Sequence, residues 1–268
     1  MGIDMKIWYQ LVSSETGMKN FLQATQKLCQ DAASPDTQVE VRGTSQGALG
    51  DQFRLFWNYD VREIIDNALK VRQTGGYDAF VLANSLDPAL VELREIMDIP
   101  VVSFMEITCF HACTMGEKFG LIVPNEKMIP RYREIPIGYG LRDRLATVQA
   151  IGFSNIRGFD TVFTDSKVGD ECVEQVLASA RRCIELGAEV VIPAGPHATL
   201  LAQRGIHEVD DVPIIDSYRL LSKSAELVVS MHQLTGVHIS RKLLYQAPEQ
   251  EYIDKVAEVR NIPALSLK

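Results

Sequence analysis

The stretch GYDAFVLAN, at Gly76–Asn84, returns 111 positions later (187 minus 76) as GAEVVIPAG, at Gly187–Gly195. A second stretch, IPVVS at Ile99–Ser103, returns as VPIID at Val212–Asp216, at an offset of 113 (212 minus 99). Both pairs keep the same order and nearly the same offset. The chain is therefore predicted to contain one structural unit twice, with the ends of the first two stretches at equivalent places.

The duplication extends to the first strand of each copy. The run KFGLIVPN at Lys118–Asn125 resembles the opening run at Lys6–Val12, again at an offset of 113 (119 minus 6). Short β-branched or aromatic segments alternate with segments of helical apolar spacing. The expected strands are 6–12, 38–42, 78–83, 101–104, 119–123, 147–151, 190–193 and 214–216, and the expected helices are 17–30, 59–72, 88–97, 107–116, 168–186 and 217–234. This alternation predicts an α/β fold of two pseudo-symmetric halves, each a parallel sheet with helices on both faces and with a cleft between them.

The two halves are expected to divide between residues 104 and 117. The helix at 217–234 is expected to cross back, so that the first half comprises 1–105 and 217–268 and the second comprises 106–216. No linker rich in Pro, Gly or Ser separates them, which predicts tight packing. The charged tail from Thr235 onward is expected to be a surface extension.

Composition points to a small-molecule protein. The chain has 268 residues, of which 46% are hydrophobic and 23% charged, as in an ordinary soluble globular protein. No apolar run approaches the roughly 18 residues that span a bilayer, and no signal segment opens the chain, so a cytoplasmic protein without a membrane partner is expected. A net charge of −8 argues against nucleic acid as a partner.

The five cysteines form no disulfide framework and are expected to be reduced. Cys109, His111 and Cys113 are close in sequence and raise the question of a metal site. On a helix the two cysteines share one face, while His111 points about 200° away from Cys109. No metal is therefore expected.

In open parallel sheets, ligands bind beyond the carboxyl ends of the strands. Small, hydroxyl and amide side chains stand at these ends and suit a cradle for a carboxylate or an oxyanion. The residues expected to bind substrate there are Ser13, Ser14, Ser85, Asn125, Gly195 and Pro196. Nucleotide binding lacks support, because no G-x-G-x-x-G follows the first strand and no Walker-type motif occurs in the chain.

The repeated segments together carry a family resemblance. Gly76–Leu90, the Arg94–Val102 stretch, Glu106 and Gly187–Gly195 resemble the aspartate/glutamate/hydantoin racemase superfamily. The Asp87-Pro88 pair and Glu106 are most similar to its hydantoin and allantoin racemase branch, with arylmalonate decarboxylases and maleate isomerases as relatives. The resemblance covers residues 5–234.

The resemblance implies an active site between the two halves and no cofactor. It implies a cysteine at the end of each repeated strand, with one thiol removing a proton from the substrate's α-carbon and the other returning one on the opposite face. It also implies a ligand-side tyrosine at Tyr59, and a homo-oligomer, since relatives often assemble.

This chain departs from that pattern. Asn84 stands where the first thiol is expected, and Gly195, or Ala194 if the loop is shifted by one, stands where the second is. No cysteine falls at either strand end. Three residues are the alternative catalytic candidates. His197, expected on a loop at the cleft mouth, could act as acid or base, or be a helix-start residue. Asn84 could stabilise an oxyanion or shape a turn, and Glu106 could be catalytic or a first-turn acid favoured by the helix dipole.

Three functions remain open from the sequence. The first is a cofactor-independent hydrolase, lyase or isomerase that acts on a small carboxylate or cyclic amide or imide without thiols. The second is a hydantoin-type racemase or isomerase with an unconventional acid and base. The third is a non-catalytic relative that binds a small molecule.

Overall fold

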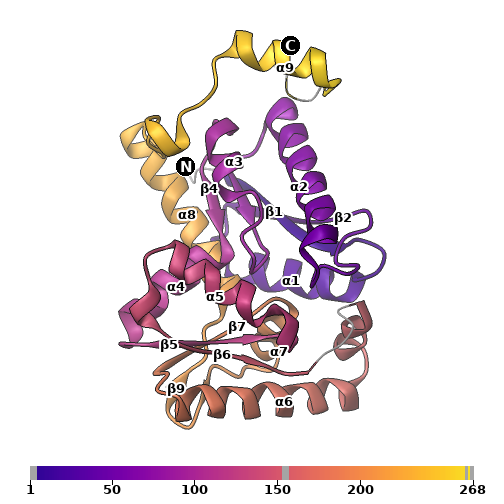
Figure 1. Ribbon diagram of the computed structural model, residues 1–268, viewed down its shortest axis with the longest axis vertical. Coiled ribbons are helices and arrows are strands. Elements are labelled where there is room, and N and C mark those ends of the chain that lie inside the picture. The colour runs from indigo at the N-terminus through magenta and orange to yellow at the C-terminus, as the bar shows by residue number, and fades with distance from the viewer. Residues whose placement is uncertain (1–4, 153–156, 263–264, 266–268) are drawn as a thin grey trace.

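The first of two sheets lies in the N-terminal part of the chain. The computed structural model describes residues 5–152, 157–262 and 265. Four parallel strands form the sheet in the order β2-β1-β3-β4 (Figure 1). Their bounds are Met5–Ser14 for β1, Thr37–Thr44 for β2, Ala79–Leu82 for β3 and Val101–Ser103 for β4.

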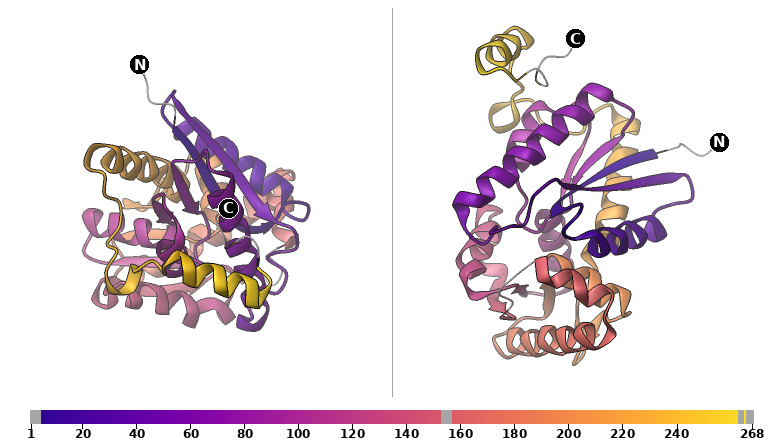
Figure 2. Two further views of the ribbon diagram at one scale, coloured as in Figure 1. Left: turned by 90° about the horizontal axis from the view of Figure 1, so that it is seen from above. Right: turned by 90° about the vertical axis from the view of Figure 1, so that its right-hand side faces the viewer.

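Helices cover both faces of this sheet. The helices α1 (Lys19–Ala32) and α8 (Ser217–Thr235) pack side by side on one face, and α2 (Arg54–Thr74) lies on the other (Figure 2). The short α3 (Leu90–Ile96) precedes β4. All four residues of β3 are buried, as expected of a central strand covered on both sides.

The second sheet repeats the first with one strand reduced. Its parallel strands run in the order β6-β5-β7. A fourth strand was expected at 214–216, but only an isolated parallel bridge joins Ile214 to Val191. The hairpin β8–β9 ends at Pro213 and α8 begins at Ser217, so few residues remain between them for a strand. The bounds are Phe119–Val123 for β5, Leu145–Ala150 for β6, Val190–Pro193 for β7, Glu208–Val209 for β8 and Val212–Pro213 for β9.

Most of the remaining helices surround the second half, whereas the tail after α8 lies against α3 of the first half (Figure 1). They are α4 (Phe104–Met115), α5 (Ile129–Gly138), α6 (Ser166–Glu185), α7 (Pro196–Gln203) and, in the tail, α9 (Gln250–Arg260), with 3-10 turns η1 (Glu126–Met128), η2 (Arg142–Arg144), η3 (Arg157–Phe163) and η4 (Leu243–Tyr245). The basic and acidic residues at 131–144 predict a solvated helix and loop over the cleft. The prediction is wrong for the first part of this run, because α5 buries Tyr132 and Pro136.

The strand register confirms the duplication and corrects one offset. Ile7 pairs with Ala79 between β1 and β3, and Phe119 pairs with Val190 between β5 and β7. The first strands are therefore related by 112 positions (119 minus 7), one fewer than the sequence match suggested. The repeated strands keep 111 (190 minus 79), which places the residue after Ala83 and the residue after Ala194 at equivalent strand ends.

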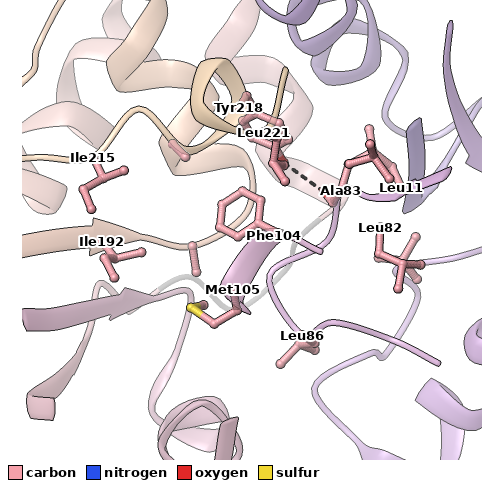
Figure 3. Close-up of a cluster of buried hydrophobic side chains, with 14 of the residues drawn as sticks. Leu11, Leu82, Ala83, Leu86, Phe104, Met105, Ile192, Ile215, Tyr218 and Leu221 are labelled. Atoms are coloured by element: carbon pink, nitrogen blue, oxygen red, sulfur yellow. Dashed lines mark hydrogen bonds between the residues drawn. The ribbon is translucent and has the colours of Figure 1, made fainter. Parts of the chain in front are cut away.

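A buried apolar cluster joins the two halves (Figure 3). Phe104 at the start of α4 and Tyr218 at the start of α8 meet edge to face, with ring centroids 5.2 Å apart. The Tyr218 hydroxyl donates to the main-chain oxygen of Ala83, at the end of β3 (3.4 Å). Ile192 of β7 and Leu82 of β3 belong to the same hydrophobic core. The two sheets therefore share one continuous core.

Polar contacts also connect the halves. The Asp160 carboxylate in η3 accepts hydrogen bonds from the amides of Asn20 and Phe21 (3.3 and 2.8 Å) and so caps the first turn of α1. Arg54 at the start of α2 pairs with both carboxylate oxygens of Glu134 in α5. The assignment of 1–105 and 217–268 to one half stays a prediction. No helix within the described residues has the length and apolarity needed to cross a bilayer.

Candidate functional site

The loops that follow β3 and β7 face each other across the boundary between the halves. A Cβ placed on Gly195 would find Ser85 Oγ at 3.9 Å and no closer atom among the described residues. Ser85 Oγ in turn shares a hydrogen bond of 2.7 Å with Tyr132 Oη, and both side chains are buried. We call Asn84, Ser85, Tyr132 and Gly195 the interlobe site. It combines a hydroxyl pair from both halves with a glycine at which an added Cβ would be in van der Waals contact with Ser85.

The loop after β3 is fixed by unusual backbone geometry. Asn84 Oδ1 accepts a hydrogen bond from the Leu86 amide (2.9 Å), which forms an Asx turn. Asp87 and Ala89 follow with φ of 44° and 57°, in the left-handed region that residues with a side chain seldom adopt. The turn uses the side-chain oxygen of Asn84, so its side-chain NH₂ group is the part left to donate to a ligand.

Asp87 anchors this loop to α4. Its two carboxylate oxygens accept hydrogen bonds from the main-chain amides of Met105 and Glu106, each at 2.8 Å, and the Tyr139 hydroxyl donates a further hydrogen bond. Burial raises the pKa of the Asp87 carboxyl to about 6, against the opposing effect of these hydrogen bonds. Asp87 therefore acts as the cap that joins the end of β3 to the start of α4.

Glu106 is engaged in an ion pair. Arg94 binds its carboxylate with both guanidinium nitrogens, at 2.8 and 2.6 Å, and also donates to the main-chain oxygen of Val101. These contacts connect α3, β4 and α4. The described contacts of Glu106 do not include a residue of the interlobe site, so its catalytic role stays an untested prediction.

Of the two interpretations of His197, the structure has the helix-start residue and not the loop at the cleft mouth. Pro196 begins α7, which places His197 in the first turn of a helix, where its side chain is 1% exposed and packs against Phe159 with ring centroids 4.4 Å apart. Its Nδ1 lies 2.9 Å from the main-chain oxygen of Ala194. Burial lowers the pKa of His197 to about 4, so the imidazole is neutral at pH 7. His197 is therefore a buried helix residue and not an exposed acid or base at the mouth of a cleft.

Gly195 has a backbone conformation that requires glycine. Its φ of 57° and ψ of −136° lie outside the regions open to residues with a side chain. Pro196 follows at the first helical position, where its missing N–H costs no hydrogen bond. The end of β7 is therefore shaped by a Gly-Pro turn.

The other predicted binding residues divide into two groups. Ser13 and Ser14 are buried at the end of β1, and the Ser14 hydroxyl donates to the main-chain oxygen of Ser45 (3.1 Å). Asn125 follows β5, and its Oδ1 is buried without a hydrogen-bond partner among the described residues. Tyr59, by contrast, is 73% exposed on α2, so the structure does not bring it to the buried hydroxyl pair.

Sequence reasoning missed Tyr132 and the surroundings of Asp51. Tyr132 lies in a run of charges that suggested a solvated segment, although its spacing from Met128 and Pro136 marks a buried helical face. Asp51 is 5% exposed in the loop between β2 and α2, where the available signal was the turn-forming pair Gly50-Asp51. Next to it, the Arg131 guanidinium stacks 4.2 Å from the ring centroid of Trp57.

Comparison with known proteins places this arrangement in a family. The family model described as Asp/Glu/Hydantoin racemase matches residues 12–225. The chain belongs to this family. Hydantoin racemase from Pseudomonas sp. (strain NS671) is 25% identical over 230 residues, which cover 83% of this chain and 85% of that protein. Hydantoin racemase from Paenarthrobacter aurescens is 25% identical over 195 residues, covering 71% and 76%.

Solved structures confirm the racemase fold. Allantoin racemase from Klebsiella pneumoniae superposes with a TM-score of 0.77 at 19% identity, covering 91% of this chain and 94% of that one. Allantoin racemase from Pseudomonas fluorescens gives a TM-score of 0.74 at 18% identity, covering 91% and 97%. Within this racemase-family fold, β3 and β7 are followed by Asn84 and Gly195. That these two are the family's thiol positions stays a prediction from the resemblance.

Proposed function

We propose that this racemase-family chain is a cofactor-independent enzyme that binds a small carboxylate or cyclic amide in the interlobe site. It acts there without thiols, in a reaction that builds negative charge on a carbonyl or carboxylate oxygen. The observation that supports the proposal is the buried hydrogen bond between Ser85 and Tyr132, one hydroxyl from each half, next to Gly195, which has no side chain. One hydroxyl of the pair donates to the other, which polarises the second O–H, and that O–H can donate to an oxyanion in a water-poor site.

The residues at the two strand ends argue against a symmetric two-base reaction. Asn84 has an amide and Gly195 has no side chain, so neither can take up a proton from carbon at neutral pH. His197 is buried and neutral, with one ring nitrogen at the Ala194 oxygen. The proposal therefore favours one-sided chemistry over racemisation by two opposed groups.

The names of the relatives supply the first compounds to test. Hydantoin racemase and allantoin racemase act on cyclic ureides, which carry carbonyl groups next to an acidic C–H. We propose 5-substituted hydantoins, allantoin and small dicarboxylates as the substrate panel. Each offers an oxygen on which negative charge can develop.

The test compares binding and turnover in matched variants. Ser85→Ala and Tyr132→Phe each remove one hydroxyl, and each is expected to lower turnover by about 10²-fold or more, the loss typical of one oxyanion donor. Tyr252→Phe is the control, because Tyr252 is exposed on α9. Binding is measured by calorimetry, ring opening by chromatography, and configuration by circular dichroism.

The outcomes separate the three functions. Ring opening or α-proton exchange without inversion supports the proposal. Inversion of configuration at a catalytic rate favours the racemase alternative, and tight binding without any chemical change favours the binding protein. If wild-type protein neither binds nor alters any member of the panel, the proposed substrate class is wrong.

A further inference from the structure

The loop at residues 45–53, between β2 and α2, is held against the first strand. Thr44 Oγ1 donates to the main-chain oxygen of Val12 (2.7 Å), and the Gly47 amide donates to Thr44 Oγ1 (2.9 Å). A Cβ on Gly47 would come within 1.9 Å of the same Val12 oxygen, so only glycine permits this approach. The loop therefore has a fixed place at the carboxyl edge of the first sheet, the edge at which Ser85 also lies.

The turn in this loop directs a carboxyl inward. Ala48 and Gly50 have φ of 60° and 80°, and the Phe53 amide donates to the Gly50 oxygen (2.9 Å). As a result Asp51 is 5% exposed, whereas Leu49 in the same loop is 62% exposed. The loop exposes an apolar residue and buries an acid, the reverse of what solvation favours.

The Asp51 carboxyl is incompletely hydrogen bonded. Its Oδ1 is buried and has no partner among the described residues. The nearby Arg131 guanidinium donates to the main-chain oxygen of Asp51 (3.0 Å) while it stacks on Trp57. A buried carboxyl oxygen without a partner is costly and calls for an explanation.

The charged groups around Asp51 come from two helices. Asp60 lies on α2 and Arg131 on α5, and the Tyr132 phenol on α5 is within electrostatic reach. Burial raises the pKa of Asp51 to about 7, with Asp60 adding to the rise and Arg131 opposing it. This carboxyl can therefore both accept and donate a proton near neutral pH, as general acid–base catalysis requires.

We propose that Asp51 transfers a proton to and from the substrate in the interlobe site. The proposal rests on the function proposed above, since Ser85 and Tyr132 are taken to bind the oxygen that becomes negative. Tyr132 connects the two parts. It shares a hydrogen bond with Ser85 (2.7 Å), and its chain neighbour Arg131 donates to the main-chain oxygen of Asp51 (3.0 Å).

The step is a proton transfer that needs no further reactant. The Asp51 carboxylate takes a proton from a carbon next to a carbonyl. The C–H bond breaks, and its electron pair forms the double bond of an enolate. The enolate oxygen accepts a hydrogen bond from whichever hydroxyl of the Ser85–Tyr132 pair is not donating to the other. The proton then returns from Asp51 to the same carbon. In D₂O the carboxyl exchanges with solvent, so a deuteron is returned instead.

A single group serves a single face of the substrate, so the configuration is retained. The inference therefore names both a substrate class and a stereochemical result. The substrate is a small carbonyl compound with an acidic C–H, such as a 5-substituted hydantoin. The result is exchange of that hydrogen with solvent, without racemisation.

The first experiment needs no substrate. Carbon NMR of protein labelled at the aspartate carboxyls is expected to show one midpoint near pH 7 that disappears in Asp51→Asn. Asp60→Asn is expected to move this midpoint to lower pH by removing a neighbouring negative charge. Asp66→Asn is the control. Asp66 pairs with Arg62 on the surface, so this substitution is expected to leave the Asp51 midpoint unchanged. An Asp51 midpoint near the ordinary value of about 4 overturns the inference.

The second experiment uses D-5-benzylhydantoin in D₂O. Proton NMR follows exchange at the ring carbon with wild-type protein, Asp51→Asn, Asp66→Asn and no protein, and calorimetry follows binding of the same compound. The inference expects wild-type exchange with retained configuration, at least about 100-fold slower exchange in Asp51→Asn, and little change in binding.

The outcomes distinguish the two proposals. Exchange that survives Asp51→Asn but falls in Ser85→Ala removes Asp51 from the reaction and leaves the proposed function intact. Binding by the wild-type protein without exchange also overturns the proton transfer. Failure of the wild-type protein to bind any compound of the panel overturns the proposed function itself.

Discussion

Gly195 shows how one residue determines what the site can hold. Space is available beside it, since the nearest described atom to an added Cβ would be 3.9 Å away. The obstacle to a side chain is the backbone, because φ of 57° with ψ of −136° is costly for any residue other than glycine. A change at this position therefore tests conformation separately from crowding.

We expect Gly195→Ala to lower the free energy of unfolding by about 1–3 kcal/mol, the cost of a residue held in a sparsely populated backbone region. Gly138→Ala is the matched control, since Gly138 lies in α5 and an added Cβ there meets nothing within 4 Å. That control is expected to be neutral or stabilising by up to about 1 kcal/mol. Urea unfolding measures both, and equal stability of the two variants contradicts the explanation.

The pH dependence of stability tests Asp51 without any ligand. Its carboxyl keeps a proton up to about pH 7 in the folded protein but loses it near the ordinary value of 3.8 when unfolded. The folded state then binds more protons between these values, so stability is highest below the lower value and falls as the pH rises to the higher one. Asp51→Asn removes this loss.

We therefore expect Asp51→Asn to gain stability relative to wild-type protein as the pH rises from 4 to 7. A shift of this size corresponds to roughly 4 kcal/mol at most. Asp87, whose pKa is raised to about 6, is present in both proteins and so cancels in the comparison. Thermal unfolding at several pH values measures the difference, and a difference independent of pH contradicts a raised pKa.

The sequence predicted the positions of some candidate residues better than those of others, for physical reasons. Ser85 was predicted from its position after a repeated strand, which the register confirms as a strand end. For His197 both a loop and a helix start were open, because composition does not give the length of the loop after β7, and α7 in fact begins directly after Gly195. Tyr132 was missed because the charged residues around it in the sequence obscure the short apolar pattern of the buried face of α5.

At the scale of elements, helix capping connects the two halves. Asp160 in η3 caps α1 through the amides of Asn20 and Phe21, and it also accepts from the Asn20 side chain (2.8 Å). Asp165 caps α6 within the second half, and its carboxylate accepts hydrogen bonds from the main-chain amides of Lys167 and Val168. One cap crosses the boundary between halves and the other does not.

We expect Asp160→Ala to cost about 1–2 kcal/mol of unfolding free energy, because three hydrogen bonds to the start of α1 are lost. Asp165→Ala is the control for a cap inside one half and is expected to cost about 1 kcal/mol. Chemical denaturation followed by circular dichroism measures both variants. Unchanged stability of Asp160→Ala contradicts a capping role across the boundary.

Elements with strong periodicity were predicted well, and short or tertiary-dependent ones were not. The strand at Phe119–Val123 matches its expected bounds, since a fully buried apolar run has few alternatives. The helix expected from residue 59 begins at Arg54, because Phe53 and the turn at Gly50 fix its start instead of a polar cap. The reduced strand at Ile214 depends on a hairpin that local patterns do not reveal.

At the scale of the molecule, the duplication predicted two sheets but not how closely they combine. Phe104, Tyr218 and Leu82 belong to a core that both halves share, and α8 returns to the first sheet after the second is complete. A sequence repeat identifies equivalent strands, whereas the contacts between copies arise from residues that differ between them. Tyr132 and Ser85, one in each half, are such a pair.

The stacking of Arg131 on Trp57 has a spectroscopic consequence. The chain contains two tryptophans, and Trp8 lies on β1 against Tyr77, with ring centroids 5.3 Å apart. Trp57 is buried beneath a guanidinium carried by the other half, next to the loop that holds Asp51. A Trp8→Phe protein would thus emit from a single indole at the junction, and its fluorescence would report directly whenever a ligand shifts one half against the other.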